Sequence, residues 1–419
     1  MNPYHDSDPQ VNLMLDLIRQ PFVLGTALWL ATPPADVSTT PPVPARARAI
    51  DLAICLDTSG SMDGLIDSAR QGIWAIVNDL ALAKPTPKLR VALLSYGNDG
   101  HSKDAGWVAV ETGFTEDLDL VSQKLFALRT NGGTELVGRV LHASLDQLEW
   151  APAQDAMKLI VVAGNESADQ DQEVSFRSTC KRAIERGIMV DAIYCGNPND
   201  GIAPGWREVA QLADGQFHAI DKDHGNVTVE TPFDAQLQAL SAQLNQTYLP
   251  FGTDGARGWL NQTAQDKNAE GVGGAVVAQR AACKAGVNYC NSAWDLVDAC
   301  RNQTVKLAEL PAEQLPQVMR TMSLEERQKH VDTLQSQRAA VQGKIQELTK
   351  KRDAAVAEEL KKRALDPTKS FDYAVRKAVR AQARARGLEI AEPETTGPQA
   401  PATVTPETGA DGAKGQKGC

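Results

Sequence analysis

Short apolar runs alternate with longer amphipathic stretches along residues 49–245 of this 419-residue chain. An apolar run of four to eight residues between turn signals is typical of a buried strand, whereas apolar residues spaced three and four apart indicate a helix. The alternation predicts an α/β fold with a doubly wound, mostly parallel sheet. The predicted strands are Ile50–Leu56, Leu89–Tyr96, Trp107–Thr112, Lys158–Ala163, Ile188–Cys195 and Gln216–Ala219. The predicted helices are Met62–Ala83, Leu118–Leu128, Glu135–Glu149, Glu173–Arg186, Gly205–Ala213 and Pro232–Asn245.

One predicted strand breaks the regular alternation. Trp107–Thr112 follows Tyr96 with no helical stretch between them, so a parallel crossover cannot join the two strands. We therefore expect one antiparallel strand at the edge of the sheet.

The pattern of apolar and polar residues changes after residue 246. Residues 247–261 carry one proline and three glycines with little apolar periodicity, which predicts a linker after a domain at 49–246. Residues 262–390 predict an all-α region, in which a capping box at Ser323 begins a long helix. Its coiled-coil-like seam is interrupted by Arg338 and predicts either a hairpin within the chain or self-association. The seam comprises Val331, Leu334, Val341, Ile345 and Leu348. Residues 391–419 are predicted to be disordered.

The N-terminal segment 1–48 carries a signal-like apolar run followed by a Pro-rich linker. Phe22–Ala31 is too short to span a bilayer, but with Arg19 before it and Met14 as the start it resembles a secretory signal. Read from Met1, the preceding acidic residues disfavour export, and an amphipathic helix remains the alternative. We expect a secreted or periplasmic protein, with peripheral envelope association or a cytoplasmic location left open.

Net charge and cysteine content limit the partners, the zinc sites and the disulfides that we expect. The net charge of −10 disfavours nucleic acid, and the basic stretch 327–386 is expected to be a solvated helix face. The seven cysteines include no Cys-x-x-Cys pair, which argues against a structural zinc site. Cys55 and Cys195 are expected in the core; if the chain is exported, Cys180 with Cys195, or a pair among the three cysteines at 283, 290 and 300, are candidate disulfides.

The first candidate site follows the first predicted strand. Asp57, Ser59 and Ser61 come at the end of the apolar run, and Gly60 allows a tight turn. Carboxylate and hydroxyl oxygens are the ligands that magnesium or calcium prefers. The stretch therefore predicts a divalent-cation site at the end of a strand.

Two further loops are expected at the same edge of the sheet, because ligands bind beyond the carboxyl ends of parallel strands. One is Asn131-Gly-Gly-Thr134, where the Thr134 hydroxyl could reach a cation held by the first loop. The other follows Ala163, at Gly164-Asn165-Glu166-Ser167.

These motifs and the order of elements resemble a von Willebrand factor A domain with a metal-ion-dependent adhesion site, over about residues 49–245. The resemblance implies a Rossmann-like fold in which Ser59, Ser61 and Thr134 touch Mg²⁺, or Mn²⁺ or Ca²⁺, and Asp57 supports the site. It also implies that an Asp or Glu of a partner protein completes the metal shell. Partner contacts are then expected at Met62, Gly133 and Glu135.

The chain departs from the family pattern in the third loop. Gly164 stands where the family usually has an aspartate, so one acidic ligand is missing and weak cation binding is expected. Asn165 or Glu166 could fill the space instead.

We interpret the chain as a non-enzymatic protein-binding module for adhesion or scaffolding. The alternatives are an accessory subunit of an ATPase or chelatase-type assembly and a structural envelope protein with a vestigial site. A hydrolase would need a base and an elbow motif, which is absent around Ser59 and Ser61, and no phosphate-binding loop is present. The cluster at residues 218–224 could be a second metal site but is more typical of a solvated loop.

Overall fold

The computed structural model describes residues 49–152, 156–220, 227–365 and 367–390. These residues lie in one compact unit. The predicted signal-like segment, the cluster from 221 to 224 and the predicted disordered tail lie outside the described residues, so those predictions stay untested. Within the described ranges, no helix is both long enough and apolar enough to cross a membrane.

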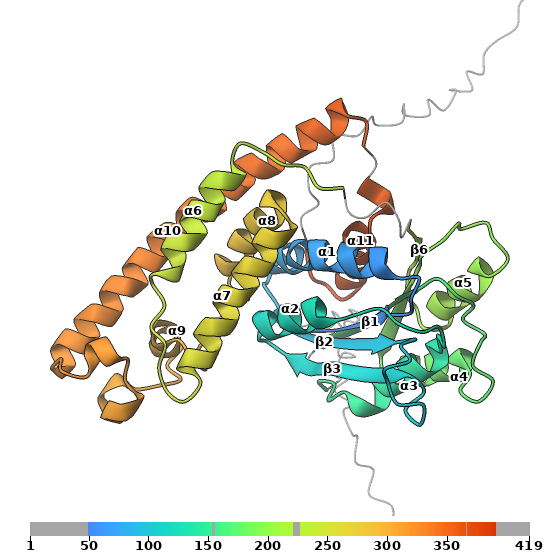
Figure 1. Cartoon of the computed structure of the whole chain (residues 1–419), viewed down its shortest axis with the longest axis horizontal. Helices are drawn as coiled ribbons and strands as arrows, with labels where there is room; N and C mark the ends of the chain where they lie inside the picture. Colours follow the sequence, from blue (N-terminus) through green and yellow to red (C-terminus); the bar gives the residue numbers. More distant parts are fainter. Residues whose placement is uncertain (1–48, 153–155, 221–226, 366, 391–419) are drawn as a thin grey trace, which may run out of the picture. The chain divides into compact units, whose positions relative to one another are not determined.

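A six-stranded sheet organises the first half of the chain (Figure 1). The strand order is β3-β2-β1-β4-β5-β6, and every pairing is parallel except β2 with β3. The mostly parallel sheet with one antiparallel edge strand confirms the predicted fold class. The strands are β1 (Ala49–Asp57), β2 (Lys88–Tyr96), β3 (Val108–Thr115), β4 (Ala156–Gly164), β5 (Ile188–Tyr194) and β6 (Phe217–Ala219).

Helices cover both faces of the sheet, as its continuously apolar strands require. Alternate residues of β1 point to opposite faces: Leu52 and Ile54 pack with α1 and α2, whereas Ala53 and Cys55 pack with α3, α4 and α5. The helices of this half are α1 (Asp63–Ala81), α2 (Leu118–Ala127), α3 (Val137–Gln147), α4 (Phe176–Glu185) and α5 (Ala203–Leu212).

The last helix on the sheet comes from the far end of the sequence. Helix α11 (Phe371–Ala385) packs against α1 and contacts β4 and β5. Its Arg380 pairs with the buried Asp79 of α1, and the Gln382 side chain donates to the Asp214 carbonyl. Helix α6 (Asp234–Asn245), expected to complete the α/β part, packs instead against α8 and α10.

The remaining described helices form a second group around the long helix α10. They are α7 (Gly255–Val272), α8 (Gly274–Lys284), α9 (Leu296–Arg301) and α10 (Leu324–Lys362), with short 3-10 turns η1 (Leu307–Glu309), η2 (Ala312–Gln314), η3 (Gln317–Met319) and η4 (Pro367–Lys369). The capping box predicted at Ser323 begins α10. The stretch expected as a linker at 247–261 is packed: Tyr248, Leu249 and Phe251 are buried, and α7 begins at Gly255.

The seam of α10 faces the same chain. Val331 and Ile345 are buried, and the helix packs against α6, α8 and α9. The sequence suggested that Arg338 interrupts the seam, but the structure shows that it does not. Its guanidinium is buried and pairs with Asp295 at 2.6 Å and with Asp298 at 2.8 Å. Carboxylates from the neighbouring segment thus allow a charge at a core position of the helix.

The candidate disulfides do not form. All six described cysteines are free, and Cys180, Cys195 and Cys283 are buried. Cys55 and Cys195 lie in the core, as their apolar surroundings in the sequence predicted.

Candidate metal centre

Three loops meet at the carboxyl edge of the sheet, beyond β1, β2 and β4. The Thr58 N–H donates to the Tyr96 carbonyl at 2.8 Å, which ties the first loop to the end of β2. The Gly60 N–H donates to the Gly132 carbonyl at 3.0 Å, and the Asn131 N–H donates to the Thr58 carbonyl at 2.9 Å. Backbone hydrogen bonds therefore hold the glycine-rich loop against the first loop, as the sequence predicted.

The first loop turns around the Asp57 carboxyl. Asp57 is fully buried, and its Oδ1 accepts a hydrogen bond from the Ser59 N–H at 2.8 Å. The Ser59 and Ser61 hydroxyl oxygens lie 3.3 Å apart. Ser59 is buried whereas Ser61 is exposed, so the pair leads from the interior to the surface.

The third loop reaches the same place through Asn165. The Asn165 side-chain amide donates to the Ser61 hydroxyl at 3.1 Å. Glu166 is exposed, and its backbone carbonyl accepts from the Trp206 indole N–H at 2.8 Å. Of the two substitutes expected for the missing aspartate, Asn165 is the one whose side chain contacts a site hydroxyl.

The residues expected to touch a partner differ in accessibility. Gly133 is exposed, and Thr134 is partly exposed. Met62 is fully buried among core side chains, so a partner cannot reach it. Glu135 is 4 % exposed and points inward, which does not fit a direct partner contact either.

Glu135 instead lies against Asp57, an arrangement that the sequence reasoning missed. Burial, followed by the charge of Asp57, raises the pKa of Glu135 to about 8. Burial also raises the pKa of Asp57, although hydrogen bonds, first from the Ser59 N–H, oppose the rise. A glutamate directly after Thr134, in a chain that lacks the third-loop aspartate, was the signal that could have revealed the pair.

Two oxygens of this carboxyl pair are left without a partner. Asp57 Oδ2 and Glu135 Oε2 are buried and have no hydrogen bond of normal geometry. Buried polar atoms are nearly always satisfied, so each orphan indicates a missing proton, water or ion. Two acidic oxygens beside serine hydroxyls fit a hard divalent cation. Asp57, Glu135, Ser59 and Ser61 are the residues that could hold it, and the partly exposed Thr134 of the adjoining loop stays a predicted ligand.

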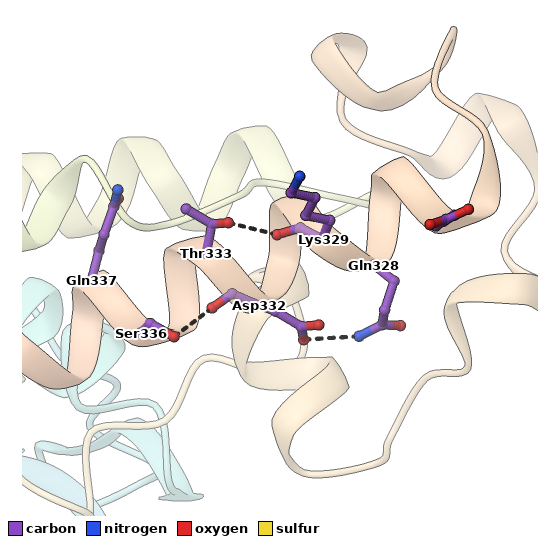
Figure 2. Close-up of a pocket in the computed structure, with 7 residues that line it drawn as sticks. Gln328, Lys329, Asp332, Thr333, Ser336 and Gln337 are labelled. Carbon is purple, nitrogen blue, oxygen red and sulfur yellow. Dashed lines mark hydrogen bonds between the residues drawn. The ribbon is translucent and has the colours of Figure 1, made fainter.

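Other candidate sites do not share these properties. His101 Nε2 lies 2.8 Å from the Ser95 hydroxyl, and His142 pairs with Asp146, so both histidines have partners outside the serine loop. An open hollow on one face of α10 is lined by polar side chains, several of which hydrogen-bond within the helix (Figure 2). In that hollow Gln328 donates to Asp332 at 2.9 Å, an ordinary helix-surface contact.

A doubly wound α/β domain that presents oxygen ligands at the carboxyl edge of its sheet defines the class of this part of the chain. The family model of the von Willebrand factor type A domain matches residues 51–239. This region of the protein is therefore a von Willebrand factor type A domain, the family that its motifs resemble.

Similar folds occur among solved structures. The SpRpn10 VWA domain is 14% identical, with a TM-score of 0.34 over 42% of this chain and 89% of that one. Proximal thread matrix protein 1 from the mussel byssus, in a structure with a zinc-occupied MIDAS motif, is 13% identical, with a TM-score of 0.34 over 43% of each chain. The pilus adhesin SpaC from Lactobacillus rhamnosus GG is 13% identical, with a TM-score of 0.31 over 42% of this chain and 28% of its own. The match thus spans less than half of the mussel and pilus proteins. No curated protein matches the chain.

Proposed function

We propose that this protein is a non-enzymatic binding protein whose von Willebrand factor type A domain holds a divalent cation, Mg²⁺ or Mn²⁺ first, and through it binds an acidic side chain of a partner protein. The observation that carries the proposal is the pair of unsatisfied buried oxygens, Asp57 Oδ2 and Glu135 Oε2, on carboxyls beside the Ser59 side chain, whose hydroxyl lies 3.3 Å from that of Ser61. A cation between these groups would satisfy both oxygens and offset the cost of burying two carboxylates.

Access to the site supports binding rather than a purely structural ion. Ser61 and Gly133 are exposed, so the outer side of the hydroxyl pair faces solvent. A bound cation there would keep a coordination position that an Asp or Glu of another protein can fill. Among the described residues, His101 and His142 bind partners away from the serine loop, so neither histidine is placed to act as a base for Ser59 or Ser61.

The test is a calorimetric titration of the full chain with MgCl₂, MnCl₂ and CaCl₂ separately. We expect measurable binding of at least one of the three ions to the wild-type protein. Ser59→Ala should weaken that binding at least about 10-fold, because it removes one oxygen from the site. Circular dichroism should show an unchanged fold, since the substitution removes only the hydroxyl that lies against Ser61 in the loop.

Ser167→Ala is the matched control. The Ser167 hydroxyl also lies in a loop at this edge, but it accepts a hydrogen bond from the Asp169 N–H at 3.3 Å and is not one of the proposed ligands. Cation binding should therefore stay unchanged. Absence of binding heat and of thermal stabilisation by millimolar cation would refute the proposal. Where binding is seen, protein capture with and without a chelator then identifies cation-dependent partners.

A further inference from the structure

We infer that Glu135 replaces the missing third-loop aspartate as the second acidic ligand of the cation site. The inference rests on the proposed function and assigns one ligand within it. The supporting observation is the packing around Gly164, Gly97 and Asp57 at the end of the sheet. This packing leaves room for the Glu135 carboxyl but not for an acidic side chain at position 164.

The position of Gly164 cannot hold an acidic side chain as this domain is packed. A Cβ atom added there would collide with the Tyr96 hydroxyl and lie 3.2 Å from the Trp206 ring and 3.3 Å from Asp57 Oδ2. The Tyr96 hydroxyl is itself fixed, because it donates to the Ala163 carbonyl at 3.0 Å. Tyr96 therefore takes the space that a carboxylate from β4 would need.

The second carboxylate of the site comes instead from Glu135, which lies next to Gly97. Gly97 has a φ of +76°, and a Cβ atom there would lie 2.8 Å from Asp57 Oδ1 and 2.9 Å from Glu135 Cγ. The missing side chain at Gly97 thus makes the room in which the two acidic side chains meet. Glu135 enters this space from the residue that follows Thr134, just before α3.

The charges of the pair match a dication. Asp57 and Glu135 are both almost fully buried, and each keeps one oxygen unsatisfied. Two carboxylates would neutralise one divalent cation. The charge of Glu135 would therefore compensate for the aspartate that the family has at the position of Gly164. A surface acid such as Glu166, which solvent screens, cannot provide the same compensation.

The alternative is that Glu135 is only a buried acid that shares a proton with Asp57. Mn²⁺ binding to the full chain, measured by calorimetry and by the electron paramagnetic resonance signal of free Mn²⁺, separates the two. We expect Glu135→Gln, which keeps the shape of the side chain, to weaken Mn²⁺ binding by about 10-fold or more. Glu166→Gln removes an exposed acid of the neighbouring loop and should change the affinity less than about 3-fold.

A rescue experiment makes the assignment sharper. In the Glu135→Gln background, Tyr96→Phe together with Gly164→Asp removes the blocking hydroxyl and places a carboxylate on β4. We expect this triple variant to recover Mn²⁺ affinity, and Gly164→Asp alone to lower the unfolding temperature because of the clash with Tyr96. If Glu135→Gln fails to fold, Glu135→Met tests the same loss of charge with an apolar side chain of similar length.

The outcomes distinguish this inference from the proposed function. Mn²⁺ binding that Glu135→Gln leaves unchanged overturns the ligand role of Glu135 and leaves a cation site formed by Asp57, Ser59 and Ser61. Equal losses in Glu135→Gln and Glu166→Gln also overturn it, because general charge would then explain the effect. Absence of Mn²⁺ binding to the wild-type protein overturns the proposed function itself.

Discussion

At the residue scale, the cation site depends on which positions lack side chains as much as on which carry oxygens. The sequence indicated Asp57, Ser59 and Ser61, because a polar cluster at the end of an apolar strand is visible in the local pattern. The glutamate directly after Thr134 was visible in the sequence, but the inward direction of its side chain was not. That direction follows from the space over Gly97 and from the position of the Tyr96 hydroxyl, both set by a strand distant in sequence.

Gly97 and Gly187 offer a matched pair of substitutions. Both have positive φ, +76° and +65°, but a Cβ atom at Gly187 meets nothing within 4 Å, whereas one at Gly97 crowds Asp57 and Glu135. Gly187→Ala should cost only the conformational penalty, about 1 kcal/mol. Gly97→Ala should cost more, about 2–4 kcal/mol of unfolding free energy, because crowding adds to that penalty.

Urea denaturation of the two variants beside wild type measures the difference. Equal losses of stability in both would show that the carboxyl pair does not occupy the space over Gly97. Such a result would also remove one support of the ligand role inferred for Glu135.

At the scale of the single element, α10 shows how far a periodic pattern can be interpreted. The apolar positions correctly predicted one long helix, and its capping box located the start. The same pattern made Arg338 look like a defect, although Val331, Arg338, Ile345 and Arg352 form one buried row at intervals of seven. Arg352 pairs with Asp234 at 2.8 Å, so both arginines of the row have carboxylate partners on other segments. Partners so distant in sequence cannot be seen in a helical pattern.

Arg338→Met tests the buried ion pairs of this row. The variant keeps much of the aliphatic volume but leaves Asp295 buried without its counter-ion and Asp298 with only the partly exposed Arg301, 3.0 Å away. We expect a loss of about 3–5 kcal/mol in unfolding free energy. Lys351→Met on the same helix is the control, since its exposed pair with Glu347 is worth at most about 0.5 kcal/mol. Chemical denaturation that gave the same stability for both variants would contradict a structural role for Arg338.

At the scale of the whole molecule, the order of the sequence and the order of packing differ. The strands and the helices between them were predictable, because each crossover is local and follows the apolar pattern. The helix that completes the face of α1 was not, because α11 lies far beyond the apolar periodicity of the α/β part. Helix α6 has a suitable length and place in the sequence, yet it packs with the helical group.

Val379→Asp tests whether α11 is part of the core of the domain. Val379 is fully buried with the side chains that cover the sheet, so a charge there should cost more than about 3 kcal/mol. Lys377→Asp introduces the same residue at an exposed position of the same helix and should leave the unfolding temperature nearly unchanged. Loss of stability is measured by thermal unfolding followed by circular dichroism, and a normal unfolding temperature for Val379→Asp would show that α11 is not needed.

The late position of α11 has a consequence for synthesis. As the chain leaves the ribosome, strands β1 to β6 emerge well before the helix that covers the outer sides of β4 and β5. Until residue 385 has been translated, that apolar surface stays open to water and to other nascent chains, a condition that favours aggregation. A premature stop before α11 would leave the same surface uncovered in the released chain, so we expect such a truncated protein to aggregate.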